Sequence, residues 1–315
     1  MIVTVTLNPA VDKTLVVPGF AVGKTNRGEI ERLDAGGKGI NVAKALKQLG
    51  CSVTAIGFLA GMNGRFILRA LEALEIPAGF VDVEGESRGN LKITDPRNAT
   101  ETEINESGFP VGPEHLERFK EKLGEYASRA KVVVFSGSLP PGVPQDTYAV
   151  LLAIARAQGA KTILDTSGAA LAKGMQGRPD FVKPNRAEAE ELLRRRLDNH
   201  NELARAVREL LDMGPSTAAI SMGAEGLVAG RRGRIVLAVP PAVQARSSVG
   251  AGDALVAAFA CGMVEGLEFD AAVRLATAMG AATAAASGSS VAGMDAVRAM
   301  LPQIVLTPLD EGIIQ

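Results

Sequence analysis

The chain has 315 residues, of which 47% are hydrophobic, and its formal net charge at pH 7 is -1. That length accommodates one large α/β domain or two ordinary ones, and the composition supplies ample material for a buried core. A charge so close to zero argues against a protein that binds nucleic acid or a membrane surface through bulk positive charge. Local basic clusters could still bind small anions.

The chain offers little for metal or disulfide chemistry. Cys51 and Cys261 are its two cysteines, and His115 and His200 its two histidines. No Cys/His zinc spacing can be built from them, and a disulfide framework is not expected. The opening residues lack the basic segment and long apolar run of a signal peptide, and the uncharged stretch 275–291 is rich in small residues, which predicts a core helix and not a membrane span. We therefore expect a cytoplasmic protein with neither a nucleic-acid nor a membrane partner.

Short apolar runs alternate with amphipathic segments along most of the chain. Such alternation, with runs rich in Val and Ile, predicts a mainly parallel sheet covered by helices on both faces. Glycines at 50 and 159 stop two of the helices. The expected strands are 2–7, 52–58, 131–137, 160–168, 180–185, 217–223 and 227–230, and the expected helices are 40–50, 66–74, 147–159 and those beginning at 186 and near 251 and 270.

Two stretches break this alternation. Residues 14–33 and 89–105 read as extended, polar-alternating strands with no helix between them. They predict a small flanking sheet, which would serve as a lid or as a dimer surface. No linker, low-complexity run or internal repeat divides the chain. We expect one domain over residues 1–315, with lid strands from about 14–33 and 89–105.

Gly250, Ala251 and Gly252 lead directly into Asp253 and an apolar helix. A helix start presents unpaired N–H groups and a partial positive charge, and glycines let an anion approach them closely. A phosphoryl group in transfer needs such a cradle, and its attacking hydroxyl needs a base, for which a carboxylate can serve. Alternatively, Asp253 only complements the helix dipole. The glycine-rich lead-in favours the functional interpretation, because a simple cap does not need it.

A second glycine turn, at residues 36–39, precedes the helix that carries Asn41. Close backbone approach together with an amide suits a polyhydroxy ligand. The alternative is a tight loop with Lys38 as a surface lysine, which three glycines in four residues make less attractive.

Arg88, Asn90 and Lys92 stand at alternate positions, so a strand places them on one face. Arg27 and Lys38 could join them in a clamp for a phosphate already present on the substrate. The alternative is an ordinary solvated strand face.

Asn185 and Glu188 have the spacing of a capping box. The functional alternative is that they order a hydrated Mg²⁺ beside phosphates. Gly223 and Gly226 follow a strand, where a flat ligand could lie against the backbone, although most such turns only close a hairpin.

Two better-known nucleotide motifs are absent. The stretch 19–25 has three residues between its glycines where a P-loop needs four, and it does not join a strand to a helix. It is expected to turn between two lid strands. The turn at 250–252 lacks the third glycine and the later acidic residue of a dinucleotide fingerprint, which disfavours a nicotinamide oxidoreductase.

Taken in order, six segments resemble the ribokinase-like (phosphofructokinase B type) sugar kinases over nearly the whole chain. The segments are TLNPAVDKTL, GGKGINVAKAL, GSLPPGV, VKPNRAEAEEL, SMGAEG and SVGAGDAL. The opening segment and the strand at 87–93 resemble the branch that phosphorylates hexose phosphates, which includes 1-phosphofructokinase, tagatose-6-phosphate kinase and a minor 6-phosphofructokinase. LDTSGAAL and VPPAV are nearer to the last of these, and GGKGIN to the first two.

The resemblance implies a three-layer α/β/α fold with a β-sheet lid, often within a dimer, and a requirement for ATP and Mg²⁺. It implies Asp253 as the catalytic base and the 250–252 amides as the anion hole. Glu188 and Asn185 would hold the metal through water. The implied sugar-side residues are Asp12, Gly37, Lys38, Asn41, Arg88, Asn90, Lys92, Ser138 and Arg27, and the nucleotide-side residues are Lys183, Asn185, Ser221, Gly223 and Gly226.

The first expectation for function is therefore ATP-dependent phosphorylation of fructose 1-phosphate to the 1,6-bisphosphate. Tagatose 6-phosphate and fructose 6-phosphate are the alternative acceptors. A non-catalytic nucleotide or sugar-phosphate sensor on a kinase fold is an alternative of a different class, which loss of the base or of the glycine loop would support.

Overall fold

The computed structural model describes residues 1–243, 249–286 and 291–309. Its larger sheet is made of β1 (Ile2–Thr6), β4 (Val53–Leu59), β5 (Ala78–Asp82), β8 (Val132–Ser136), β9 (Lys161–Asp165), β10 (Phe181–Val182), β11 (Thr217–Ser221), β12 (Leu227–Arg231), β13 (Arg234–Val239) and β14 (Val305–Pro308). The spatial order is β14-β13-β12-β11-β10-β9-β8-β1-β4-β5. All neighbours from β5 to β11 run parallel, and β12, β13 and β14 add antiparallel pairs at one edge. The expected mainly parallel sheet is confirmed.

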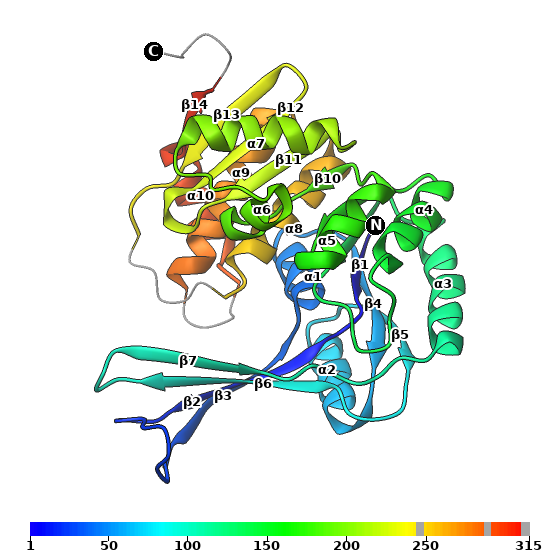
Figure 1. The fold of residues 1–315 in the computed structure, drawn as a ribbon, viewed down its shortest axis with the longest axis vertical. Helices are drawn as coiled ribbons and strands as arrows, with labels where there is room; N and C mark the ends of the chain where they lie inside the picture. Colours follow the sequence, from blue (N-terminus) through cyan, green and yellow to red (C-terminus); the bar gives the residue numbers. More distant parts are fainter. Residues whose placement is uncertain (244–248, 287–290, 310–315) are drawn as a thin grey trace.

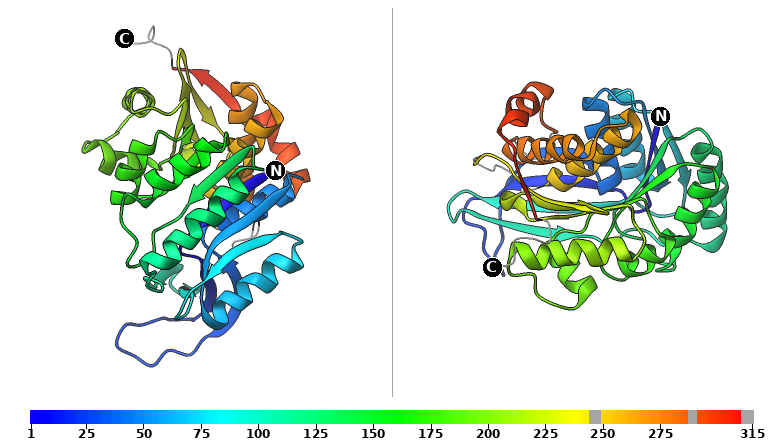
Figure 2. Two further views of the ribbon diagram at one scale, coloured as in Figure 1. Left: turned by 90° about the vertical axis from the view of Figure 1, so that its right-hand side faces the viewer. Right: turned by 90° about the horizontal axis from the view of Figure 1, so that it is seen from above.

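Helices cover both faces of this sheet (Figures 1 and 2). Strand residues alternate between two cores, because successive side chains point to opposite faces: Val132 and Val134 belong to one, Val133 and Phe135 to the other. The first core is completed by α1 (Lys38–Gln48), α2 (Gly61–Ala73), α8 (Ala251–Glu265), α9 (Phe269–Ala285) and α10 (Met294–Met300). The second is completed by α3 (Pro113–Ala127), α4 (Thr147–Ala157), α5 (Gly168–Gly174), α6 (Arg186–Leu193) and α7 (His200–Asp212).

A separate four-stranded sheet projects from this body (Figure 1). It consists of β2 (Ala10–Val16), β3 (Glu29–Gly36), β6 (Arg88–Asp95) and β7 (Thr100–Asn105), in the order β3-β2-β6-β7. The expected small sheet is thus present, but β2 begins four residues before position 14 and residues 17–28 form a loop. Ala10 and Val11 are buried where the strand leaves the body, so its polar alternation begins only at Asp12. The stretch 19–25 lies in the loop between β2 and β3, as expected.

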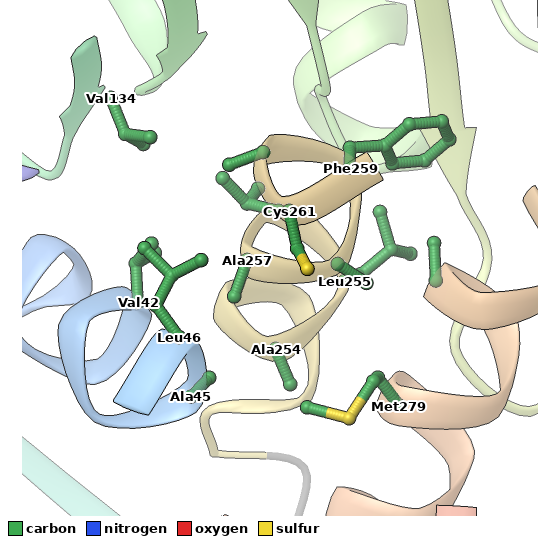
Figure 3. Close-up of a cluster of buried hydrophobic side chains, with 14 of the residues drawn as sticks. Val42, Ala45, Leu46, Val134, Ala254, Leu255, Ala257, Phe259, Cys261 and Met279 are labelled. Atoms are coloured by element: carbon green, nitrogen blue, oxygen red, sulfur yellow. The ribbon is translucent and has the colours of Figure 1, made fainter. Parts of the chain in front are cut away.

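Helix α8 is buried between α1 and α9 (Figure 3). Its residues from Asp253 to Gly262 are all buried, and alanines at 254, 257, 258 and 260 allow its neighbours to approach closely. Because a buried helix has little freedom to shift within a close-packed core, its first turn is held firmly in place.

Sequence reasoning did not assign α3, α7 or the strands at 78–82, 234–239 and 305–308, and it expected six strand residues where β10 has two. The expected core helix at 275–291 corresponds to α9 up to Ala285, while residues 287–290 lie outside the described part of the chain. Within the described ranges, no helix is long and apolar enough to span a membrane.

Candidate active site

Asp253 lies in the first turn of α8 and is only 6% exposed. The turn before it is tight: Gly250 caps the helix with φ 80°, a conformation that glycine adopts at no steric cost. Ala254 donates the first helical hydrogen bond, to Gly250 O at 2.8 Å, so the amides before it have no acceptor within the helix. The structure therefore places a carboxylate beside free helix-start amides, while Ser247 and Ser248 of the same motif lie outside the described residues.

Burial changes the chemistry of Asp253. Loss of solvent, assisted by the nearby negative charge of Asp165, raises the pKa of its carboxyl to about 6, against the opposing effects of Lys38 and Asn41. Asn41, on the first turns of α1, donates a hydrogen bond from Nδ2 to Asp253 Oδ2 at 2.9 Å. A carboxylate with a pKa near neutrality is well suited to accept a proton from a hydroxyl group.

A buried ion network adjoins Asp253, and its centre is a residue that sequence reasoning missed. Asp165, at the end of β9 and 1% exposed, has Oδ1 at 3.1 Å from Lys183 Nζ and Oδ2 at 3.5 Å from Lys38 Nζ. Ser136 Oγ, at the end of neighbouring β8, lies 3.2 Å from the same Oδ2. A carboxylate at the end of a buried strand of a parallel sheet was the available signal, because ligands bind at the carboxyl ends of such strands.

The second glycine turn brings α1 to the same edge of the sheet. Gly37 caps α1 with φ 102°, and a Cβ there would lie 3.1 Å from Pro9 Cα and from Thr6 Cγ2. The turn therefore needs glycine both for its conformation and for its close approach to the strand before it. Lys38 and Asn41 follow on the first turns of α1. Lys38 faces Asp165, and Asn41 donates to Asp253.

The small sheet contributes a chain of polar contacts. Asn90 Nδ2 donates to Asp12 Oδ1 at 2.7 Å, and Arg88 Nη1 donates to Asn90 Oδ1 at 3.1 Å. Asp12 and Asn90 face each other in the parallel register of β2 and β6. Burial, partly offset by Arg88 and Asn90, raises the pKa of Asp12. Strand pairing thus brings together three of the predicted sugar-side residues.

Two cavities open around this chain of contacts. Asp12, Asn90 and Lys92 line one of about 120 Å³, which Val249 of the turn before α8 also lines. Arg88 and Ser138 line a second of about 380 Å³. Lys92 is not a free cation, because its Nζ lies 2.8 Å from Glu101 Oε2 on β7.

Arg27 lies apart from these residues. It is exposed in the loop 17–28, beyond the last β2–β3 pair at Val16 and Glu29, whereas Asp12 pairs with Asp34 nearer the body. Within one chain the structure does not bring Arg27 to the other sugar-side residues, and its role stays a prediction.

Asn185 and Glu188 form the capping box of α6. Asn185 Oδ1 accepts from Glu188 N at 2.9 Å, and Glu188 Oε2 accepts from Asn185 N at 2.8 Å. The other carboxylate oxygen, Oε1, lies 3.8 Å from Lys38 Nζ, so Glu188 also faces the ion network. Among the described residues, no group of three Asp, Glu, His or Cys side chains is placed to enclose a metal ion.

The remaining nucleotide-side residues lie at strand ends beside this box. Lys183 follows β10 and is 3% exposed, and Ser221 ends β11 and pairs with Asn185 in an isolated bridge. Gly223 and Gly226 lie in the turn that joins antiparallel β11 and β12, so this turn closes a hairpin. A Cβ on Gly223 would meet no atom within 4 Å, so the surface above it is open.

Comparison with known proteins identifies the family to which the chain belongs. The model of the pfkB family carbohydrate kinases matches residues 5–296. The chain is 41% identical to a 1-phosphofructokinase of Rhodobacter capsulatus, over 88% of both chains, and 35% identical to a 1-phosphofructokinase of Escherichia coli (strain K12), over 98% of this chain and 99% of the relative.

Solved structures agree with the sequence comparison. Phosphofructokinase-2 from Escherichia coli in complex with substrates and products superposes with a TM-score of 0.91 at 29% identity, covering 96% of this chain and 98% of that one. A second solved structure, from Staphylococcus aureus, gives a TM-score of 0.84 at 31% identity, covering 98% of this chain and 99% of that one. The expected ribokinase-like fold is confirmed, and the chain belongs to the pfkB family of carbohydrate kinases, which use ATP as phosphoryl donor.

Proposed function

We propose that this protein transfers the terminal phosphoryl group of ATP to fructose 1-phosphate and forms the 1,6-bisphosphate. The observation that carries the proposal is the position of Asp253: a buried carboxylate with a pKa raised to about 6, beside unpaired helix-start amides. The relatives named as 1-phosphofructokinases, at 41% and 35% identity, support this acceptor.

In the proposed reaction, Asp253 accepts the proton of the sugar hydroxyl as its oxygen attacks phosphorus. A new O–P bond forms while the bond from phosphorus to the bridging oxygen of ADP breaks. Developing charge on the phosphoryl oxygens meets the amides of Gly250, Ala251 and Gly252, a preorganised arrangement that stabilises transferring phosphoryl groups. Asn41 orients the carboxylate through its 2.9 Å hydrogen bond.

The acceptor's ring hydroxyls would lie against Asp12, Gly37, Lys38 and Asn41, near Ser138. Its phosphate would face Arg88, Asn90 and Lys92, with Arg27 a further candidate. The polar chain from Asp12 through Asn90 to Arg88 supports one acceptor site for both groups of residues, because Asp12 and Asn90 line the 120 Å³ cavity and Arg88 lines the 380 Å³ cavity.

The nucleotide would lie over Lys183, Ser221, Gly223 and Gly226. Mg²⁺, when bound, neutralises charge on the phosphates and orients them. The residues present fit a hydrated ion held through water by Glu188 and Asn185, because one carboxylate and one amide suit the few protein ligands that Mg²⁺ usually takes beside phosphates. In this scheme Glu188 caps α6 and faces the metal at once.

We further propose that two copies associate through the small sheet, whose strands β3 and β7 expose Ile30, Leu33 and Ile104. A structural neighbour, phosphofructokinase-2 from Escherichia coli, has a tetrameric inhibited form. Light scattering on the purified protein tests this assembly: a dimer that Ile30→Lys converts to a monomer supports it, and a wild-type monomer contradicts it.

The experiment that tests the acceptor is ADP release with MgATP and fructose 1-phosphate, fructose 6-phosphate, tagatose 6-phosphate or ribose, measured side by side. A dominant kcat/KM for fructose 1-phosphate is expected. Dominance of fructose 6-phosphate would instead align the chain with the structural neighbour solved with that sugar. Activity on ribose alone would contradict the phosphate clamp, and a folded, ATP-binding protein that is inactive on every sugar would favour the sensor alternative.

A further inference from the structure

Asp165 is a fully buried carboxylate shared by two lysines from different parts of the chain. Lys38 begins α1, Lys183 follows β10, and their Nζ atoms lie 3.5 and 3.1 Å from its two oxygens. The hydroxyl of Ser136 lies 3.2 Å from the oxygen that faces Lys38. Each carboxylate oxygen therefore has its own ammonium partner, and a lysine that rotates away leaves one oxygen of Asp165 without its cation.

The carboxylate itself is rigidly placed. Asp165 ends β9, which pairs with β8 in parallel register, and its backbone oxygen accepts from Gly137 N at 3.0 Å. A residue fixed on a central strand positions its partners more accurately than one on a loop.

Both lysines face the place where the phosphoryl group would cross. A Cβ at Gly252 would lie 3.7 Å from Lys183 Nζ, so this ammonium is next to the helix-start amides. Lys38 Nζ lies 3.8 Å from Glu188 Oε1 on the side of the capping box. The two lysines therefore lie between the helix-start amides at Gly252 and the proposed metal-binding residue Glu188.

We propose that Asp165 is a positioning residue for phosphoryl transfer, which holds the ammonium groups of Lys38 and Lys183 on either side of the transferring group. This inference rests on the proposed function. An unpaired ammonium group in a buried site is costly, so a fixed carboxylate between Lys183 and Lys38 favours both side chains in their places. Asp165 touches neither substrate nor nucleotide in this scheme and acts through the two lysines.

The charges around Asp253 give the proposal a distinctive signature. Asp253 is faced by Asn41, Lys38 and Lys44 of α1, by Asp165 at the end of β9 and by Lys183 after β10. After burial, Asp165 is the strongest influence that raises the pKa of Asp253, while Lys38 and Lys183 lower it. Removal of the Asp165 charge therefore moves the pKa of Asp253 downward while the lysines stay near it, so the acid limb reports the charge of Asp165 and kcat reports the placement of the lysines.

The test compares wild type, Asp165→Asn and Ser136→Ala in MgATP-dependent phosphorylation across pH. Asp165→Asn is expected to lower kcat by roughly 10- to 100-fold through misplacement of the lysines, and to move the acid limb of kcat/KM to lower pH. Ser136→Ala leaves the carboxylate charged and is expected to leave the acid limb in place. Unchanged kcat with an unchanged acid limb in Asp165→Asn overturns the proposal, and so does a lower kcat with an acid limb that does not move.

A second comparison keeps the proposal falsifiable if Asp165→Asn does not fold. Lys183→Met and Lys183→Met/Asp165→Asn differ only in the carboxylate, and the double variant removes one charge of each sign. Its acid limb is expected at lower pH than that of the single variant, and equal limbs overturn the proposal. An inactive wild type would contradict the proposed function itself, whereas an active wild type with unchanged Asp165 variants contradicts only the role of Asp165.

Discussion

Asn41 Nδ2 donates a 2.9 Å hydrogen bond to Asp253 Oδ2, although 212 residues separate the two in the chain. The contact joins the first turns of α1 and α8, each of which begins after a glycine with positive φ. Two glycine-led helix starts therefore meet at one carboxylate, and the packing of α1 against α8 holds them there.

The charge state of Asp253 affects stability as well as chemistry. Its folded-state pKa of about 6 lies above the ordinary 3.8, so the stability present below pH 3.8 is lost as pH rises through 6. A shift of this size corresponds to about 3 kcal/mol. Asp253→Asn should therefore gain unfolding free energy relative to wild type as pH rises from about 4 to about 8. Urea unfolding of both proteins across this range checks it, and a difference that does not vary with pH would count against a buried, ionising Asp253.

We expect an alanine at position 252, among the helix-start amides, to affect stability and turnover in opposite directions. A Cβ there would make ordinary contact with Lys183 Nζ at 3.7 Å, and alanine favours a helix by up to about 1 kcal/mol over glycine. Gly252→Ala should keep or raise the melting temperature but lower kcat, because the methyl group crowds the anion cradle. Gly124→Ala in α3, where a Cβ would meet no atom within 4 Å, is the matched control and should stabilise with kcat unchanged. Equal kcat values in the two variants would show that these amides do not stabilise the negative charge on the phosphoryl oxygens in the transition state.

The phosphate clamp predicts a change in affinity and not in chemistry. Arg88 is half-buried and donates a hydrogen bond to Asn90, which in turn donates one to Asp12. Arg88→Gln should raise KM for the phosphosugar on the order of tenfold or more, as expected for loss of a charged hydrogen bond, with a smaller effect on kcat. Arg97→Gln, in the distal turn of the same sheet, should leave both constants near wild type. A raised KM for ATP instead of the sugar would contradict this prediction, because Arg88 would then contact the nucleotide and not the phosphate of the sugar.

Glu188 has a structural role and a proposed metal role that can be separated. Glutamine also serves in a capping box, so Glu188→Gln should keep the melting temperature while raising the Mg²⁺ concentration needed for half-maximal activity. Glu202 of α7 makes similar contacts: its N–H donates to Asn199 Oδ1, and its carboxylate accepts from Asp198 N, one residue before the N-cap. Glu202→Ala should destabilise by about 1 kcal/mol with the Mg²⁺ requirement unchanged. If Glu188→Gln also leaves the Mg²⁺ requirement unchanged, Glu188 only caps α6 and does not help to hold the metal.

Much of the site is predictable from sequence because its residues mark local structure. Gly250 and Gly37 precede helices in a conformation that favours glycine, and Asp253 and Asn41 follow them within one turn. The period-two spacing of Arg88 and Asn90 likewise follows from a strand. Each of these signals lies within a few residues.

The position of Asp165 at a strand end marks it as a candidate, but its role could not be predicted in this way, because its partners come from distant segments. The register of β8 with β9 sets Ser136 beside Asp165, and α1 and the segment after β10 bring Lys38 and Lys183 to its two oxygens. The start of β2 was misplaced for a related reason: burial of Ala10 against the body, and not local alternation, decides where that strand begins.

The most direct measurement is turnover of wild type and Asp253→Asn with MgATP and fructose 1-phosphate, with the product identified by ³¹P NMR. We expect wild type to form the 1,6-bisphosphate, and the variant to lose on the order of 10²- to 10⁴-fold in kcat while it still melts cooperatively and binds ATP. Turnover of Asp253→Asn near the wild-type rate would contradict the account, because the buried carboxylate at the start of α8 would then not be the base.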